Sequence, residues 1–147
     1  ELYVRAVMSR RPPELAVQRV IELCFADPSR VDPAMLTASV ALAAERQRRE
    51  HPNAAAFLAA SRSLMRAAGQ RHRYWEMMAS VRVPVLLIGG EDDRLVQVAA
   101  MRQAAARNPR WESVFLAGVG HTPMLEVPDV TTDTIRDWLD RHFAMQT

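Results

Sequence analysis

The chain has 147 residues, of which 49% are hydrophobic and 24% are charged, so its composition is that of an ordinary globular domain and excludes a disordered or fibrous chain. No apolar run approaches the roughly 18 residues that a membrane span requires. The single cysteine, Cys24, excludes an internal disulfide framework and a cysteine-based zinc site, and five glycines leave almost no room for a glycine-rich phosphate loop. We expect neither a metal nor a cofactor.

The basic charge is carried by arginine alone, with 19 arginines and no lysine. Residues 1–82 have a net charge of +5 and residues 83–147 a net charge of −3, and this contrast indicates two structural units. The arginines of the basic half are scattered and no aromatic residues interleave with them, so we expect no nucleic-acid partner. No signal peptide is recognisable, and we expect a cytoplasmic protein.

Residues 1–82 are predicted to be helical, because apolar residues recur there at helical spacing and helix-ending residues separate the runs. Four short helices are expected: one opened by Pro12-Pro13 and continuing to Phe25, one that begins at Pro33, one between Asn53 and Gly69, and one through residues 74–78. Asp32 stands at the N-cap of the second helix, with Pro33 at the first helical position, where its missing N–H costs nothing.

The pattern changes at residue 83. The expected order is a buried strand over residues 83–88, a helix over 96–107, a second strand over 113–117 and a helix over 129–143. Strands that alternate with helices at this spacing are typical of a parallel crossover unit. The last helix carries Ile135, Trp138, Leu139 and Phe143 on one face, and these four side chains are predicted to be buried.

Polar residues of catalytic type follow both expected strands. The acidic run Glu91-Asp92-Asp93 follows the first strand, and the glycine-rich run 118–120 followed by His121 comes after the second. Ligands of open parallel sheets bind beyond the carboxyl ends of the strands, so an acid and a histidine at this edge can meet. The acid would then hold the imidazole in one tautomer while the other ring nitrogen serves a nucleophile.

Two stretches resemble the α/β-hydrolase superfamily. Residues 83–96 (VPVLLIGGEDDRLV) resemble the penultimate strand and acid loop of that family, and residues 118–128 (GVGHTPMLEVP) resemble its histidine loop. The acid precedes the histidine, as the family's chain order requires. The resemblance implies an α/β protein with a partial α/β-hydrolase fold, in which a helical cap (residues 1–82) is followed by the last two parallel strands and their helices (residues 83–147).

The resemblance also implies the site residues, Asp93 as the acid and His121 as the base. The family's spacing of glycine, acid and valine fits Gly90, Asp93 and Val96. Asp92 fits only the first part of that spacing, so we favour Asp93. Glu126 falls at a position that is usually structural in the family, and we expect no catalytic role for it.

The nucleophile of such a site is not in the sequence, because no Gly-x-Ser-x-Gly motif occurs. We therefore expect a fragment of a longer hydrolase that is inactive alone. The favoured activity is a serine carboxylesterase with a Ser-His-Asp triad, acting on a small apolar ester, with the serine in the missing N-terminal half. An epoxide hydrolase or dehalogenase with an aspartate nucleophile is the alternative within the class.

A non-catalytic helical interaction module is the alternative from another class, since a fold alone does not imply an activity. The pair Asp93 and His121 argues against it, because a pure scaffold has no need of that pair. Two strands alone would leave apolar faces and strand edges uncovered, so we expect a partner for the chain. That partner is either the missing N-terminal half or another copy of the chain, and no membrane span is expected.

Overall fold

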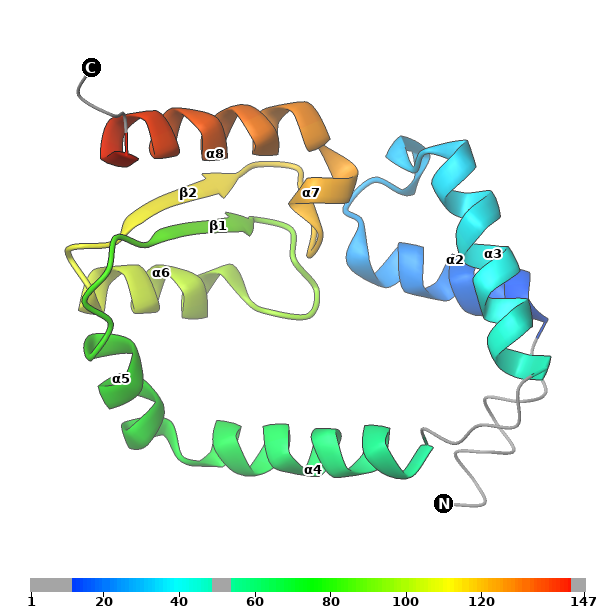
Figure 1. The fold of residues 1–147 in the computed structure, drawn as a ribbon, viewed down its shortest axis with the longest axis horizontal. Coiled ribbons are helices and arrows are strands. Elements are labelled where there is room, and N and C mark those ends of the chain that lie inside the picture. The colour runs from blue at the N-terminus through cyan, green and yellow to red at the C-terminus, as the bar shows by residue number, and fades with distance from the viewer. Residues whose placement is uncertain (1–11, 49–53, 144–147) are drawn as a thin grey trace. The chain divides into compact units, whose positions relative to one another are not determined.

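The computed structural model describes residues 12–48 and 54–143, which form two compact units (Figure 1). The helical unit comprises the described residues up to 20 together with residues 32–77. The α/β unit comprises residues 21–31 and the described residues from 78 onward. Helices thus precede strands as expected, but residues 21–31 group with the α/β unit although helices of the other unit follow them in the chain. A cap role for residues 1–82 stays a prediction.

The expected helices before residue 83 are present in the described part of the chain. They are α2 (Pro13–Cys24), α3 (Pro33–Arg48), α4 (Ala54–Gly69) and α5 (Arg71–Ala79), with a short 3-10 helix η1 (Pro28–Arg30) after α2. Asp32 caps α3 as predicted, because its Oδ1 accepts a hydrogen bond from the Met35 N–H at 2.8 Å. The predicted cap at Asn53 lies outside the described residues.

The α/β unit is built on two parallel strands, β1 (Leu86–Gly90) and β2 (Glu112–Leu116), joined by α6 (Val98–Arg107). Their register pairs Leu86 with Glu112 and Gly90 with Leu116. Figure 1 shows α6 and α8 (Pro128–Phe143) on opposite faces of this sheet. Glu112 fastens the end of α8 to β2: it forms an ion pair with Arg141 at 2.8 Å, and its Oε1 lies 3.0 Å from His142 Nε2. The crossover unit is the predicted one.

The first strand differs from its prediction at both ends. It begins at Leu86 rather than at residue 83, and Pro84, which has no N–H for a strand ladder, lies before it. It also includes Gly89 and Gly90, which were expected to end it. A Cβ on Gly90 would collide with the carbonyl oxygens of Val119 and Gly120. Gly90, the last residue of the strand, is therefore required by the close approach of the histidine loop.

The last helix is also less buried than predicted. Ile135, Leu139 and Phe143 are 41, 43 and 57% exposed, and Trp138 is half-buried. A sheet of two strands is too narrow to cover the whole apolar face of a 16-residue helix. A further short helix, α7 (Pro123–Glu126), was not predicted, and it packs against β1 and α8. None of the described helices is long and apolar enough to cross a membrane, and the cytoplasmic location stays a prediction.

We expect the chain to self-associate, because apolar side chains on α8 are exposed and the two-stranded sheet has open edges among the described residues. Sedimentation equilibrium over a range of protein concentrations measures this directly. The double variant Leu139→Glu/Phe143→Ser should weaken the association, because it places polar groups on the exposed face of α8. A strictly monomeric wild-type chain at high concentration would contradict the expectation.

Candidate active site

Asp93 and His121 are in contact at the carboxyl ends of β1 and β2. The Asp93 Oδ2 and His121 Nδ1 atoms are 2.9 Å apart. The Asp93 side chain is only 5% exposed, whereas that of His121 is 37% exposed. The sequence predicts that these two residues meet, and the structure brings the two side chains together. The acid is thus shielded from water while the ring it holds remains accessible.

The second oxygen of Asp93 fixes the direction of the carboxylate. Its Oδ1 accepts hydrogen bonds from the backbone N–H groups of Leu95 and Val96, at 2.7 and 2.9 Å. Burial raises the pKa of Asp93, but the hydrogen bonds from Val96, His121 and Leu95 outweigh it, so the pKa lies below its ordinary value. Asp93 is therefore ionised at neutral pH, with one oxygen held by the loop and the other turned to the histidine.

The ionised acid determines the tautomer of the histidine. A carboxylate can only accept a hydrogen bond, so the proton of the contact resides on Nδ1 of His121. In the neutral ring this makes Nε2 the basic nitrogen, on the side of the ring away from Asp93. The arrangement can therefore take a proton at Nε2 and stabilise the resulting imidazolium through Asp93.

The two acids that precede Asp93, Glu91 and Asp92, lie in other environments. The Glu91 carboxylate pairs with the Arg102 guanidinium, and Asp92 is exposed, with its backbone N–H donating to Val119 O at 3.0 Å. Of the three consecutive acids, only Asp93 carries a carboxylate within hydrogen-bond distance of His121 in the described structure. Its selection over Asp92 by glycine-to-valine spacing agrees with this geometry, although its catalytic role stays a prediction.

The histidine loop is supported by the turn that follows α2, which sequence reasoning did not connect with the site. The backbone N–H of His121 donates to Cys24 O at 2.6 Å. A Cβ on Gly120 would collide with that same carbonyl oxygen, so only glycine fits there. Burial raises the pKa of the Cys24 thiol, and the Asp93 charge raises it further. The thiol thus stays protonated at neutral pH, and the protonated thiol is not the nucleophilic form of cysteine.

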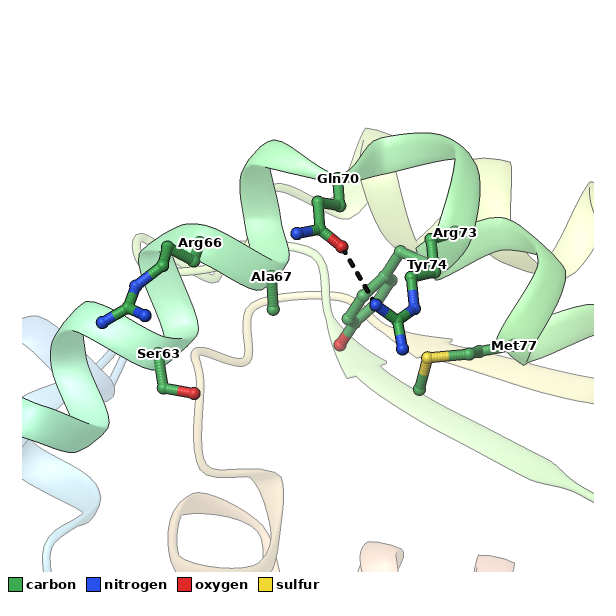
Figure 2. Close-up of a pocket in the computed structure, with 7 residues that line it drawn as sticks. All are labelled: Ser63, Arg66, Ala67, Gln70, Arg73, Tyr74 and Met77. Carbon is green, nitrogen blue, oxygen red and sulfur yellow. Dashed lines mark hydrogen bonds between the residues drawn. The ribbon is translucent and has the colours of Figure 1, made fainter.

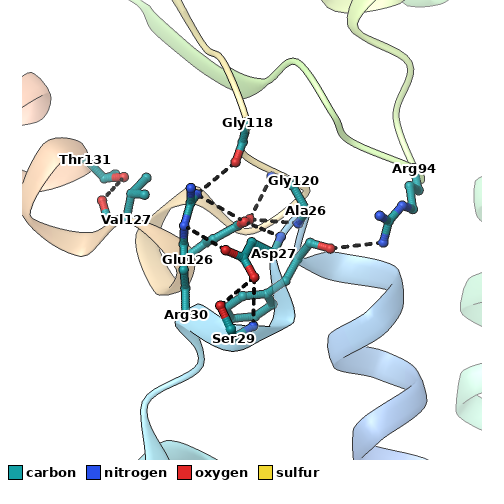
Figure 3. Close-up of polar contacts among 11 residues, drawn as sticks. Ala26, Asp27, Ser29, Arg30, Arg94, Gly118, Gly120, Glu126, Val127 and Thr131 are labelled. Carbon is teal, nitrogen blue, oxygen red and sulfur yellow. Dashed lines mark hydrogen bonds and ion pairs between the residues drawn. The ribbon is translucent and has the colours of Figure 1, made fainter.

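Glu126 ties this turn to the histidine loop (Figure 3). Its side chain is fully buried and accepts three backbone hydrogen bonds, from Gly120 at 2.7 Å, Ala26 at 3.1 Å and Asp27 at 2.8 Å. The Arg30 guanidinium lies 3.5 Å from the Glu126 carboxylate and also donates to Gly118 O at 2.8 Å. Glu126 thus has a structural environment, as its position in the resemblance implies.

The helical unit contains an open groove of about 330 Å³ between α4 and α5 (Figure 2). Its lining residues come from one face of the two helices: Ser63, Arg66, Ala67, Gln70, Arg73, Tyr74 and Met77. Arg73 Nη1 lies 3.5 Å from Gln70 Oε1 in this groove. The groove holds no pair of an acid and a histidine. No group of three metal-binding side chains occurs within residues 12–48 and 54–143.

The parallel crossover unit presents an aspartate and a histidine at neighbouring strand ends, which is the place where ligands of open parallel sheets bind. The sequence pattern of the alpha/beta hydrolase family matches residues 3–134, and the chain belongs to this family. Family membership accounts for the fold and for the order of acid and histidine along the chain.

Among curated proteins, the chain is similar to a pimeloyl-[acyl-carrier protein] methyl ester esterase of Xanthomonas oryzae pv. oryzae, with 40% identity over 53 residues. The match covers 36% of this chain and 21% of that protein, so the chain matches about a fifth of the relative's length. A second such esterase, of Xanthomonas campestris pv. campestris, is 38% identical over 58 residues, which are 40% of this chain and 23% of that protein.

Solved structures agree in fold. A serine hydrolase involved in carbazole degradation matches with a TM-score of 0.66 at 19% identity, covering 87% of this chain and 47% of that one. A thermophilic esterase from Thermogutta terrifontis matches with a TM-score of 0.57 at 19% identity, covering 95% of this chain and 48% of that one. At such identities these similarities establish the fold alone.

The lowered pKa of Asp93 makes the stability of the fold depend on pH. An unfolded aspartate titrates near pH 3.9, so the unfolded chain takes up this proton before the folded chain does. The contribution of Asp93 is complete above about pH 5 and is lost as the pH falls through the folded pKa. Urea unfolding at pH values between about 3 and 6 measures the effect.

The matched variants for this experiment are Asp93→Asn and Asp92→Asn. The amide introduced by Asp93→Asn keeps an Oδ1 acceptor for the Leu95 and Val96 N–H groups but cannot ionise. The unfolding free energy of this variant should therefore fall less steeply on acidification than that of the wild type. Asp92→Asn, which removes the neighbouring exposed carboxylate, should retain the wild-type fall. If the unfolding free energy of Asp93→Asn falls as steeply with acidification as that of the wild type, Asp93 is not the source of the pH dependence.

Proposed function

We propose that this chain provides the acid–base pair of a serine carboxylesterase. The observation that carries the proposal is the 2.9 Å contact between a shielded, ionised Asp93 and a solvent-accessible His121. Serine attack on an ester needs a base whose second nitrogen is oriented by an acid, and this pair fulfils that requirement. The serine and the oxyanion hole come, in this proposal, from sequence outside these 147 residues, and the helices of residues 1–82 act as the cap.

The chemistry uses the two nitrogens of His121 in different roles. Nε2 takes the proton of the serine hydroxyl as its oxygen attacks the ester carbonyl carbon, and Asp93 stabilises the imidazolium that forms. When the tetrahedral intermediate collapses, the bond to the alcohol oxygen breaks and His121 returns its proton to that oxygen. A water molecule, deprotonated by the same Nε2, then attacks the acyl carbon. The bond to the serine oxygen breaks, that oxygen takes the proton back from His121, and the carboxylic acid is released. No metal or cofactor takes part in these steps.

The substrate class in this proposal is a carboxylic ester with a small or medium apolar acyl chain. The curated relatives are named as esterases, and their named substrate is the methyl ester of a carrier-bound acyl chain. Esterase names among the relatives favour a serine over the aspartate nucleophile of epoxide hydrolases and dehalogenases. The residue at the nucleophile position distinguishes these two mechanisms, because only the serine enzyme forms an acyl ester on a hydroxyl oxygen.

The test compares turnover of p-nitrophenyl butyrate by the 147-residue chain and by the protein translated with the sequence upstream of Glu1. The chain alone should not hydrolyse the ester above a denatured control. In the longer protein, His121→Ala should lower kcat about a thousandfold or more, because the general base is removed. Asp93→Asn should also cost heavily, whereas the matched Asp92→Asn should be mild.

Three outcomes would contradict the proposal. Robust turnover by the 147-residue chain that depends on His121 would remove the need for an external serine. Full activity of the His121→Ala enzyme would exclude the histidine as the base. A large loss in Asp92→Asn with none in Asp93→Asn would show that the other carboxylate is the acid.

A further inference from the structure

We propose that Arg94 is a positioning residue for the Asp93–His121 pair, because its guanidinium binds the same turn that holds the histidine loop. The turn is the stretch Glu22–Asp27 at the end of α2 and is called here the α2 turn. This inference rests on the proposed function only for the catalytic role of the Asp93–His121 pair. The contacts themselves lie entirely within the α/β unit.

Arg94 joins the acid loop to the α2 turn. Its Nη1 donates to the carbonyl oxygen of Phe25 at 3.1 Å and also to that of Glu22. The last carbonyl groups of a helix have no partner within the helix and carry the negative end of its dipole. A guanidinium, which is always charged and only donates, suits this place. Phe25, whose carbonyl it binds, is among the most buried side chains, so the anchor is well packed.

The histidine loop is bound to the same turn, at Cys24. Cys24 O, between the two carbonyl groups that Arg94 binds, accepts the backbone N–H of His121. Glu126 holds the following N–H groups of Ala26 and Asp27 and that of Gly120. The acid loop and the histidine loop are thus attached to one short segment, within a few residues of each other.

The rest of the acid loop shows why this contact matters. Before Asp93 the loop is tied by backbone bonds, from Glu91 N to Leu116 O and from Asp92 N to Val119 O. After Asp93, Leu95 and Val96 are exposed, and their N–H groups bind only the Asp93 carboxylate in the described structure. Arg94 therefore holds the acid loop to the α2 turn on the C-terminal side of Asp93.

The test uses NMR on the 147-residue chain, so it does not depend on hydrolysis. Arg94→Met keeps the length of the side chain and removes its donors. We expect hydrogen exchange of the His121 amide to accelerate about tenfold or more, as for loss of one hydrogen bond that holds a loop. We also expect the Nδ1–H proton of His121, held by Asp93, to broaden or disappear. Amides of β2 should keep their protection, because the sheet register does not involve Arg94.

Two further variants make the result specific. Arg102→Met removes the same charge next to the same loop, where Arg102 pairs with Glu91, and should leave both His121 signals unchanged. Arg94→Lys restores a single donor near the two carbonyl groups and should recover part of the protection. This variant also provides the measurement if Arg94→Met does not fold.

Unchanged His121 signals in folded Arg94→Met, or equal losses in Arg102→Met, would overturn the positioning role. If neither substitution at Arg94 affects the His121 ring, the role is likewise refuted even where the longer protein proves to be an esterase. Conversely, loss of the His121 signals in Arg94→Met supports the positioning role whatever the longer protein hydrolyses. The two proposals can therefore fail separately.

Discussion

The arrangement of the α/β unit depends on a buried carboxylate, that of Glu126, and on the three backbone N–H groups that donate to it. A buried charge is costly unless it is paired and hydrogen-bonded, and here Gly120, Ala26 and Asp27 supply the donors while Arg30 supplies a positive charge. These donors come from two segments that lie far apart in the chain. Satisfying one carboxylate thus fixes the histidine loop against the α2 turn.

This constraint explains why residues 21–31, which include the last turn of α2, belong to the α/β unit while the start of α2 and the whole of α3 do not. The α2 turn meets the histidine loop at Cys24, the buried glutamate at Ala26 and the acid loop through Arg94. Its carbonyl and N–H groups would otherwise be left without partners at a helix end. The Asp93–His121 pair is therefore supported by the sheet on one side and by this turn on the other.

Local signals predicted much of this arrangement. Asp32 and Pro33 indicate the start of α3, the apolar runs indicate the two strands, and parallel strand ends place Asp93 and His121 together. Contacts between distant segments were not predictable in the same way. Gly90 lies at the end of β1, but nothing near it in the sequence indicates that carbonyl oxygens of the histidine loop approach it, and the contacts of Arg94 leave no local pattern. The exposure of α8 likewise depends on the width of the sheet and not on the helix's own pattern.

The most direct test of the Asp93–His121 pair as the base of a serine hydrolase is covalent labelling of the longer protein with a fluorophosphonate. This reagent reacts with serine hydroxyls that a neighbouring base has activated. Mass spectrometry should find the label on one serine upstream of Glu1. His121→Ala should abolish labelling, whereas His142→Ala, at the far end of α8, should leave its rate unchanged. Labelling at the full rate in His121→Ala would contradict the assignment of His121 as the base.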